Sequence, residues 1–210
     1  LLSQVDTYGP RHADYDLTHL TGLLEGRAYR MNYYAATALQ ARALLYRGGE
    51  ADKRQAYAAA REVIDSGLFP LISSDDISSA DQNGFVRENI CALEFTNLKE
   101  KQIDTYFHTS NASANMLALN SSTLSKVFPA SINADYRRQY WIQESGSYYT
   151  LTKYDYSERI PLLTIGEMYL ICAETAESLE ERQAWYNSLT YHRGQPEEEL
   201  TDKDLNEVLR

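Results

Sequence analysis

Two helical patterns separated by a pair of glycines constrain the fold of this chain more than any other feature. Over residues 30–47 the apolar side chains recur at spacings of 4, 3 and 4, which is the period of a helix. The members of this stripe are Tyr34, Ala38, Ala41 and Leu45. A second apolar stripe, with charged residues off it, covers residues 51–66. Because Gly48 and Gly49 tolerate the positive φ that ends a helix, we expect an antiparallel hairpin of two closely packed helices.

Helical patterns return at Pro161 and continue toward the end of the sequence. Thr164 and Glu167 have the spacing of a capping box, which predicts the start of a helix. The apolar stripe of this helix is expected to consist of Ile165, Met168, Cys172, Ala176 and Leu179. A partner helix is predicted over residues 180–192, and a last helix is predicted to begin with a cap at Thr201. We expect the helix from Thr164 to pack beside the first helix, since both have small residues on their apolar faces.

The middle of the chain, residues 70–160, has a different character. Its Ser, Asn, Asp and Gly clusters are typical of loops, and helical periodicity is weak. Ile90–Phe95 reads as a short buried strand, and the aromatic and β-branched tract over residues 147–156 predicts an extended segment or a hairpin.

The predicted fold class is therefore mostly α, with tetratricopeptide-like helical hairpins and an irregular, loop-rich insert containing a few short strands. We expect a single domain over residues 1–210. Its helical body would comprise residues 30–67 and 161–210, and residues 70–160 would form the insert.

Composition excludes several classes of function. The net charge of −10 opposes binding to nucleic acid, which requires neutralisation of phosphates. The 4 His residues lie in no recognisable motif, and no zinc-ligand cluster or phosphate-binding glycine loop is present. No apolar run reaches the roughly 18 residues that a membrane-spanning helix needs. We therefore expect no cofactor, no metal and no catalytic residue.

One catalytic alternative stays open, because a glycosidase needs only two carboxylates that the fold brings together. Glu167 and Glu174 are seven residues apart on one predicted helix and could share a face. However, the capping box gives Glu167 another role, and Glu174 is equally suited to pair with a buried Arg42. An all-helical glycosidase is therefore the weaker alternative.

The two cysteines, Cys91 and Cys172, each lie inside an apolar tract. A free cysteine in such surroundings behaves as a small buried hydrophobic residue. We expect both thiols to be reduced, buried and dispensable for ligand binding.

Tyrosine is unusually frequent, with 17 residues in 210. Aromatic faces pack against sugar C–H groups, and neighbouring amides and hydroxyls can bind sugar hydroxyls. The insert combines these groups, which predicts a ligand site between residues 100 and 150. The candidate ligand-binding residues are Tyr106, His108, Trp141, Tyr148 and Tyr149. Packing of these rings onto the body of the protein is the structural alternative, especially for Trp141.

Four sequence blocks, in order along the chain, resemble the SusD/RagB family of surface glycan-binding lipoproteins from Bacteroidetes. Residues 159–174 read Arg-Ile-Pro-Leu-Leu-Thr-Ile-Gly-Glu-Met-Tyr-Leu-Ile-Cys-Ala-Glu and are similar to the family pattern "iPl-x-R-x-x-E-m-Y-L-I-x-A-E". The segment 30–46 is similar to the "NYYA…ARvyLy" helix of the family. Two shorter blocks, residues 135–154 and 187–194, resemble "DyR…yw…Ky" and "N-x-L…RG".

This resemblance implies a non-catalytic subunit that captures a glycan or an oligopeptide for a SusC-like TonB-dependent outer-membrane transporter. It also implies an outer-membrane, cell-surface location through an N-terminal lipid anchor that this sequence lacks. Thr164 replaces the usual Arg of the family, and the chain stops before the Glu/Arg-rich segment of the family. We therefore expect a trimmed or short member. A tetratricopeptide-type adaptor that binds protein partners is the main alternative.

Overall fold

The computed structural model describes residues 29–78, 85–107, 117–130, 134–155 and 157–209. The predicted first hairpin is present and consists of α2 (Tyr33–Arg47) and α3 (Glu50–Asp65). Helix α2 begins three residues later than Arg30, because Asn32 is its N-cap and accepts a 2.9 Å hydrogen bond from the Ala35 amide.

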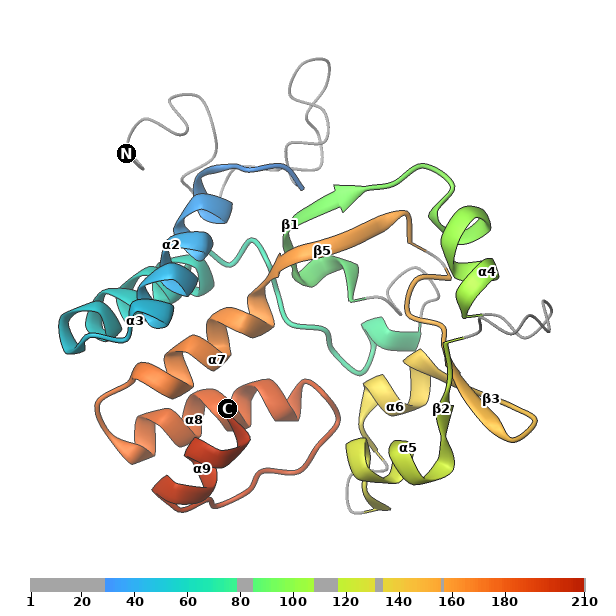
Figure 1. Cartoon of the computed structure of the whole chain (residues 1–210). Helices are drawn as coiled ribbons and strands as arrows, with labels where there is room; N and C mark the ends of the chain where they lie inside the picture. The colour runs from blue at the N-terminus through green and yellow to red at the C-terminus, as the bar shows by residue number, and fades with distance from the viewer. Residues whose placement is uncertain (1–28, 79–84, 108–116, 131–133, 156, 210) are drawn as a thin grey trace.

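The C-terminal half of the body consists of α7 (Ile165–Thr175), α8 (Leu179–Tyr191) and α9 (Asp202–Val208). Helix α7 packs against α8 on one side and against the first hairpin on the other, more extensively on α3 than on α2 (Figure 1). The predicted contact between the helix from Thr164 and the first helix is thus confirmed. Thr201 caps α9 in a capping box with Asp204, as its sequence suggests.

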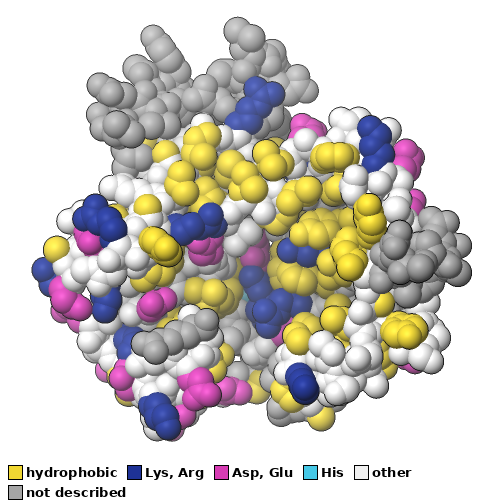
Figure 2. Space-filling model, viewed as in Figure 1, with side chains coloured by type: hydrophobic (Ala, Val, Ile, Leu, Met, Phe, Trp, Pro, Cys, Tyr) yellow, Lys and Arg dark blue, Asp and Glu magenta, His cyan; other side chains and the backbone are white. Residues whose placement is uncertain are grey.

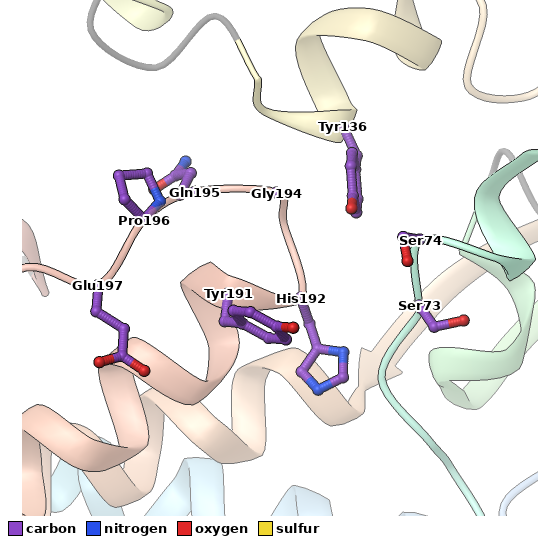
Figure 3. Close-up of a pocket in the computed structure, with 9 residues that line it drawn as sticks. All are labelled: Ser73, Ser74, Tyr136, Tyr191, His192, Gly194, Gln195, Pro196 and Glu197. Atoms are coloured by element: carbon purple, nitrogen blue, oxygen red, sulfur yellow. The ribbon is translucent and has the colours of Figure 1, made fainter.

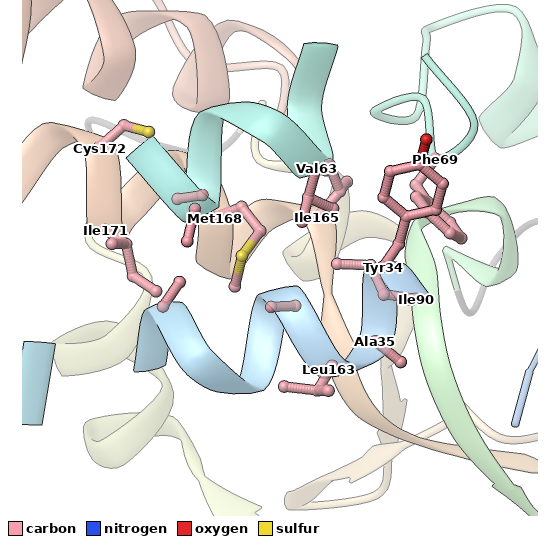
Figure 4. Close-up of a cluster of buried hydrophobic side chains, with 14 of the residues drawn as sticks. Tyr34, Ala35, Val63, Phe69, Ile90, Leu163, Ile165, Met168, Ile171 and Cys172 are labelled. Carbon is pink, nitrogen blue, oxygen red and sulfur yellow. The ribbon is translucent and has the colours of Figure 1, made fainter. Parts of the chain in front are cut away.

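The main core lies where α2, α3 and α7 meet (Figure 4). The contact faces of α2 and α3 are built from fully buried small residues, which let the helices approach closely. These residues are Ala35, Ala38, Ala41, Ala56 and Ala60. Helix α7 fills the remaining space with Met168, Ile171 and Cys172, which are at most 1% exposed. Both cysteines are free and buried, as predicted.

Strand β1 (Asn89–Glu94) confirms the predicted short strand and pairs antiparallel with β5 (Arg159–Thr164). The prediction that the helical body starts at Pro161 is wrong, because residues 161–164 belong to β5. The β1 backbone supplies the hydrogen-bonding partner for this stretch, and α7 begins only where the pairing ends. The two strands thus connect the insert directly to the helix in the middle of the body (Figure 1).

The insert holds short elements and a three-stranded sheet in the order β2-β4-β3. Part of the predicted extended tract is present as β4 (Tyr148–Leu151), which forms a hairpin with β3 (Ile142–Ser145), a strand that was not predicted. The turn between them includes Gly146 at a φ of +61°. The third strand is β2 (Leu119–Asn120), paired with β4. The short helices are α4 (Asp104–Tyr106), α5 (Ser121–Val127) and α6 (Tyr136–Trp141). Helix α4 continues a π-helical turn at Lys99–Ile103. Two 3₁₀ turns lie at Asp76–Ser78 and Val86–Glu88.

Helices α5 and α6 are not predicted from the sequence. Each is shorter than the span over which periodicity is visible, and each depends on a side chain that caps it. Asn120 accepts a hydrogen bond from the Thr123 amide, and the buried Asp135 accepts one from the Arg137 amide.

A buried ion pair joins the insert to the body. Arg193, which follows α8, donates to Glu88 at 2.6 and 2.7 Å, and both side chains are at most 10% exposed. Glu88 also accepts the Ile72 amide at 2.9 Å, so its carboxylate is well satisfied. Gly166 in α7 makes room for the pair, since a Cβ there would lie 3.0 Å from Arg193 Nη2.

Three expectations about α7 are wrong. The Thr164 side chain makes no cap hydrogen bond, and Glu167 instead accepts two hydrogen bonds from Arg42 at 2.5 Å, so there is no capping box. Arg42 is half exposed rather than buried, and Glu174 is exposed and is not its partner. Two charge-assisted hydrogen bonds from one guanidinium are stronger than the single hydrogen bond to a backbone amide that Glu167 would make in a capping box. Helix α7 also ends at Thr175, so its stripe does not continue to Leu179, which is 42% exposed.

Candidate functional site

Four of the five predicted ligand residues lie within the described part of the insert, and His108 lies outside it. Tyr106 ends α4 and is 38% exposed. Its carbonyl accepts a 2.6 Å hydrogen bond from the Leu117 amide, two residues before β2. Leu119 of β2 lies opposite Tyr149 of β4. The backbone therefore connects the segment that contains Tyr106 to the sheet that contains Tyr148 and Tyr149.

Tyr148 and Tyr149 point to opposite faces of this sheet, because successive residues of a strand alternate. Tyr148 is 52% exposed. Tyr149 is half-buried, with the Arg138 guanidinium 5.5 Å from its ring centroid. In the described part of the insert, the exposed aromatic rings are therefore Phe95, Tyr106 and Tyr148, with Tyr149 held against α6.

Trp141 is packed on both sides. Its ring lies 4.5 Å from that of Phe85, and the Lys153 ammonium lies 4.2 Å from its centroid. Burial lowers the pKa of Lys153, with the neighbouring Glu88 charge acting in the opposite direction. These contacts are those of a ring that packs the insert, which is the structural alternative given above for Trp141.

Hydrophobic side chains are gathered on the face shown in Figure 2, over β5 and the adjoining part of the insert. Over the helical hairpins the same face carries interspersed acidic and basic side chains. On this face, the hydrophobic surface thus lies toward the insert, where the ligand site is predicted.

A pocket of about 680 Å³ lies where the end of α8 faces the insert (Figure 3). It is formed by three segments that are far apart in the sequence: the end of α8 with the chain after it, the first residue of α6, and the loop before the first 3₁₀ turn. Its lining residues are Ser73, Ser74, Tyr136, Tyr191, His192, Gly194, Gln195, Pro196 and Glu197. We call it the α8–α6 pocket.

Close backbone contacts hold the walls of the α8–α6 pocket together. The Tyr136 amide donates to the Arg193 carbonyl at 2.8 Å, and Gln195 Nε2 donates to the Asp135 carboxylate. Burial raises the pKa of Asp135, but the hydrogen bonds from Arg137 and Gln195 and the Arg137 charge outweigh it, so that pKa lies below its ordinary value. Asp135 is therefore a structural anion beside the pocket.

Sequence reasoning missed the α8–α6 pocket. His192 reads as a helix member and Gly194 as a helix terminator, and nothing in the sequence brings them to Tyr136. The only signal is that two blocks of the family resemblance, around Tyr136 and around Arg193, prove to be neighbours in space. Local patterns cannot reveal a site formed by distant segments.

Across the described ranges, no group of three or more His, Cys, Asp and Glu side chains could hold a metal ion. Glu167 is occupied by Arg42, while Glu174 is an exposed residue near the end of α7. Among the described helices, none is long and apolar enough to cross a membrane.

The fold is that of a mostly helical protein in which paired helices form the body and a strand-containing segment is inserted between them. No family model and no curated protein sequence matches this chain. Solved structures do match. A SusD superfamily protein from Bacteroides thetaiotaomicron has a TM-score of 0.65 at 14% identity over 85% of this chain. A SusD-like carbohydrate-binding protein from Bacteroides vulgatus has a TM-score of 0.62 at 16% identity over 91% of it.

A third crystal structure, described as being with a xylogluco-oligosaccharide, has a TM-score of 0.64 at 17% identity over 94% of this chain. This chain spans 45%, 43% and 51% of those three proteins, or about half of their length. The SusD resemblance predicted from the sequence is confirmed at the level of the fold.

Proposed function

We propose that this chain is the glycan-binding part of a SusD-like protein and that it does not itself catalyse a reaction. The observation that carries the proposal is the shared fold. Structures of SusD superfamily and SusD-like proteins, one named for carbohydrate binding, align with 85–91% of this chain, and a structure with a xylogluco-oligosaccharide aligns with 94%. The exposed tyrosines of the insert give that fold a surface suited to sugars. An oligopeptide is the alternative ligand.

We place the proposed glycan contact on the insert, at Tyr106 and Tyr148, and Tyr149 would contact a ligand only from the opposite face of the sheet. Tyr148 is the strongest candidate, because an exposed ring on a sheet has an open face for sugar C–H groups and a hydroxyl that water or sugar can reach. Ser145 lies opposite it on β3 and Asn120 opposite it on β2, so hydroxyl and amide groups lie beside the ring. His108 belongs to the same proposal, and Trp141 would contribute by holding the insert in place.

In the proposed setting, the chain forms one SusD-like domain with residues 70–160 as its insert. It would sit on the cell surface of a Bacteroidetes outer membrane through a lipid anchor and pass its ligand to a SusC-like TonB-dependent transporter. These statements are supported by the sequence blocks and by the fold. Co-purification with such a transporter from the outer membrane of the source organism would test the partnership.

Titration calorimetry of the protein and two variants tests the glycan site. Tyr148→Ala should weaken binding of a neutral oligosaccharide by about 1–3 kcal/mol, or about 5- to 150-fold, which is the scale of a lost contact hot spot. Tyr46→Ala is the matched control, because Tyr46 is 93% exposed but lies on α2. Equal affinities in the two variants would place the site away from Tyr148.

A further inference from the structure

We propose that the α8–α6 pocket is a second sugar-binding site, separate from the insert tyrosines, and that it selects uncharged sugar units over acidic ones. The inference rests on the proposed function only in taking sugars as the class of ligand. The volume of the α8–α6 pocket, about 680 Å³, is within the range of small-molecule sites.

Two tyrosine rings face the pocket from opposite walls. Figure 3 shows Tyr136 extending from α6 toward the space above Tyr191 and His192. Tyr191 is 63% exposed, and its ring meets the His192 ring edge to face at 5.6 Å. Such rings can pack against the C–H groups of a sugar while their hydroxyls remain in water.

The Tyr136 ring is fixed before any ligand arrives. Gly194 lies so close that a Cβ on it would be 2.6 Å from Tyr136 Cε1. The hydrogen bond from the Tyr136 amide to the Arg193 carbonyl also holds the start of α6 against the chain that precedes Gly194. A ring that is already positioned loses little entropy when a ligand packs on it, which favours binding.

The polar groups of the pocket combine acceptors with hydroxyls that can donate or accept. His192 Nδ1 lies 2.8 Å from the Ile72 carbonyl, which can only accept, so the Nδ1–H tautomer fits and its Nε2 is an acceptor. Gln195 uses its amide nitrogen on Asp135, which leaves its Oε1 as an acceptor. Glu197 adds a carboxylate to the lining, and the serine and tyrosine hydroxyls add groups that can also donate. The fitting ligand therefore offers both donors and acceptors, as sugar hydroxyls do.

The charge around the pocket disfavours anions. No Lys or Arg is among the lining residues, and Glu197 is followed by two further glutamates. Arg193 and Arg137, each next to a lining residue in the sequence, are engaged in ion pairs, Arg193 with Glu88 and Arg137 with Asp135. A uronic acid would therefore meet a carboxylate without a compensating cation, whereas a neutral sugar would meet only hydrogen-bonding partners.

Ligand-observed NMR and calorimetry at pH 7 test the inference with named probes. The neutral probes are tetrasaccharides of glucose, xylose, mannose and galactose, and the acidic probe is tetragalacturonate. For at least one neutral probe, Tyr191→Ala should raise Kd at least tenfold, while Tyr46→Ala leaves it within twofold. Tetragalacturonate should bind at least tenfold more weakly than that probe, and Glu197→Gln should narrow the difference. The Tyr191→Ala protein should keep its unfolding temperature, because the ring is largely exposed.

Two results would overturn the inference. One is that Tyr191→Ala leaves the Kd of every neutral probe unchanged, and the other is that tetragalacturonate binds as tightly as the best neutral probe. Tyr148→Ala separates this inference from the proposed function. Loss of binding in Tyr148→Ala alone would support the insert site and refute the pocket. Loss in Tyr191→Ala alone would support the pocket and refute the insert site.

Discussion

Gly194 is the single residue on which the junction between body and insert depends most closely. It has a φ of +76°, and a Cβ there would lie 2.6 Å from the Ala134 carbonyl oxygen as well as against Tyr136. The carbonyl is backbone and cannot move aside like the end of a side chain. The position therefore needs glycine both for its conformation and for the space around it.

Gly194→Ala should destabilise the protein by more than the roughly 1–2 kcal/mol of a left-handed non-glycine residue. Gly67→Ala is the matched control, because Gly67 has a similar φ of +67° but no neighbouring atom within 4 Å of the added Cβ. Urea unfolding of both variants measures the difference. Equal losses of free energy would mean that the close approach at Gly194 contributes nothing.

The buried thiol of Cys172 makes the free energy of unfolding depend on pH in the alkaline range. Burial raises the pKa of its thiol from 9.0 to about 12. Between these values the unfolded chain has lost the proton and the folded protein has kept it, so the free energy of unfolding falls as pH rises. From pH 8 to pH 10.5 the wild type should lose roughly 2 kcal/mol more than Cys172→Ala. Parallel pH profiles in denaturant titrations would contradict this assignment.

At the scale of the element, the contact of α2 with α3 and α7 depends on small side chains. Ala38 and Ala41 are completely buried. Leucine at either position should overpack the contact and lower the free energy of unfolding by roughly 1–3 kcal/mol. Ala43→Leu, at an exposed position of the same helix, is the control and should change it little. A denaturant midpoint that is the same in all three variants would rule out this packing.

The same elements show what a sequence can predict. The long helices were predictable because their apolar side chains recur over several turns, and β1 because its apolar run is short and bounded by loops. The start of α7 after Thr164 was predictable too, but strand β5 before it was not, because the Ile-Pro-Leu-Leu tract forms a strand only where β1 supplies the hydrogen bonds. Glu167 was misassigned for a similar reason, since its partner Arg42 is 125 residues away.

At the scale of the whole molecule, the body and the insert meet at the α8–α6 pocket. The buried pair of Glu88 and Arg193 lies beside this junction, and Tyr136, at the start of α6, packs against Ile72 and Phe85. The insert aromatics could be proposed from the sequence, because rings among polar residues are visible there, but composition does not separate the exposed Tyr148 from the packed Trp141. The pocket could not, because only the folded chain brings its three walls together.

Equilibrium binding of neutral oligosaccharides to the wild-type protein, followed by chromatography of the recovered ligand, tests the central claim most directly. The account predicts saturable binding of at least one neutral oligosaccharide and recovery of that ligand at its original length, because the chain binds without cutting. Two results would contradict the account. One is the absence of binding across the panel, and the other is recovery of shortened products that a Glu174→Gln variant no longer forms.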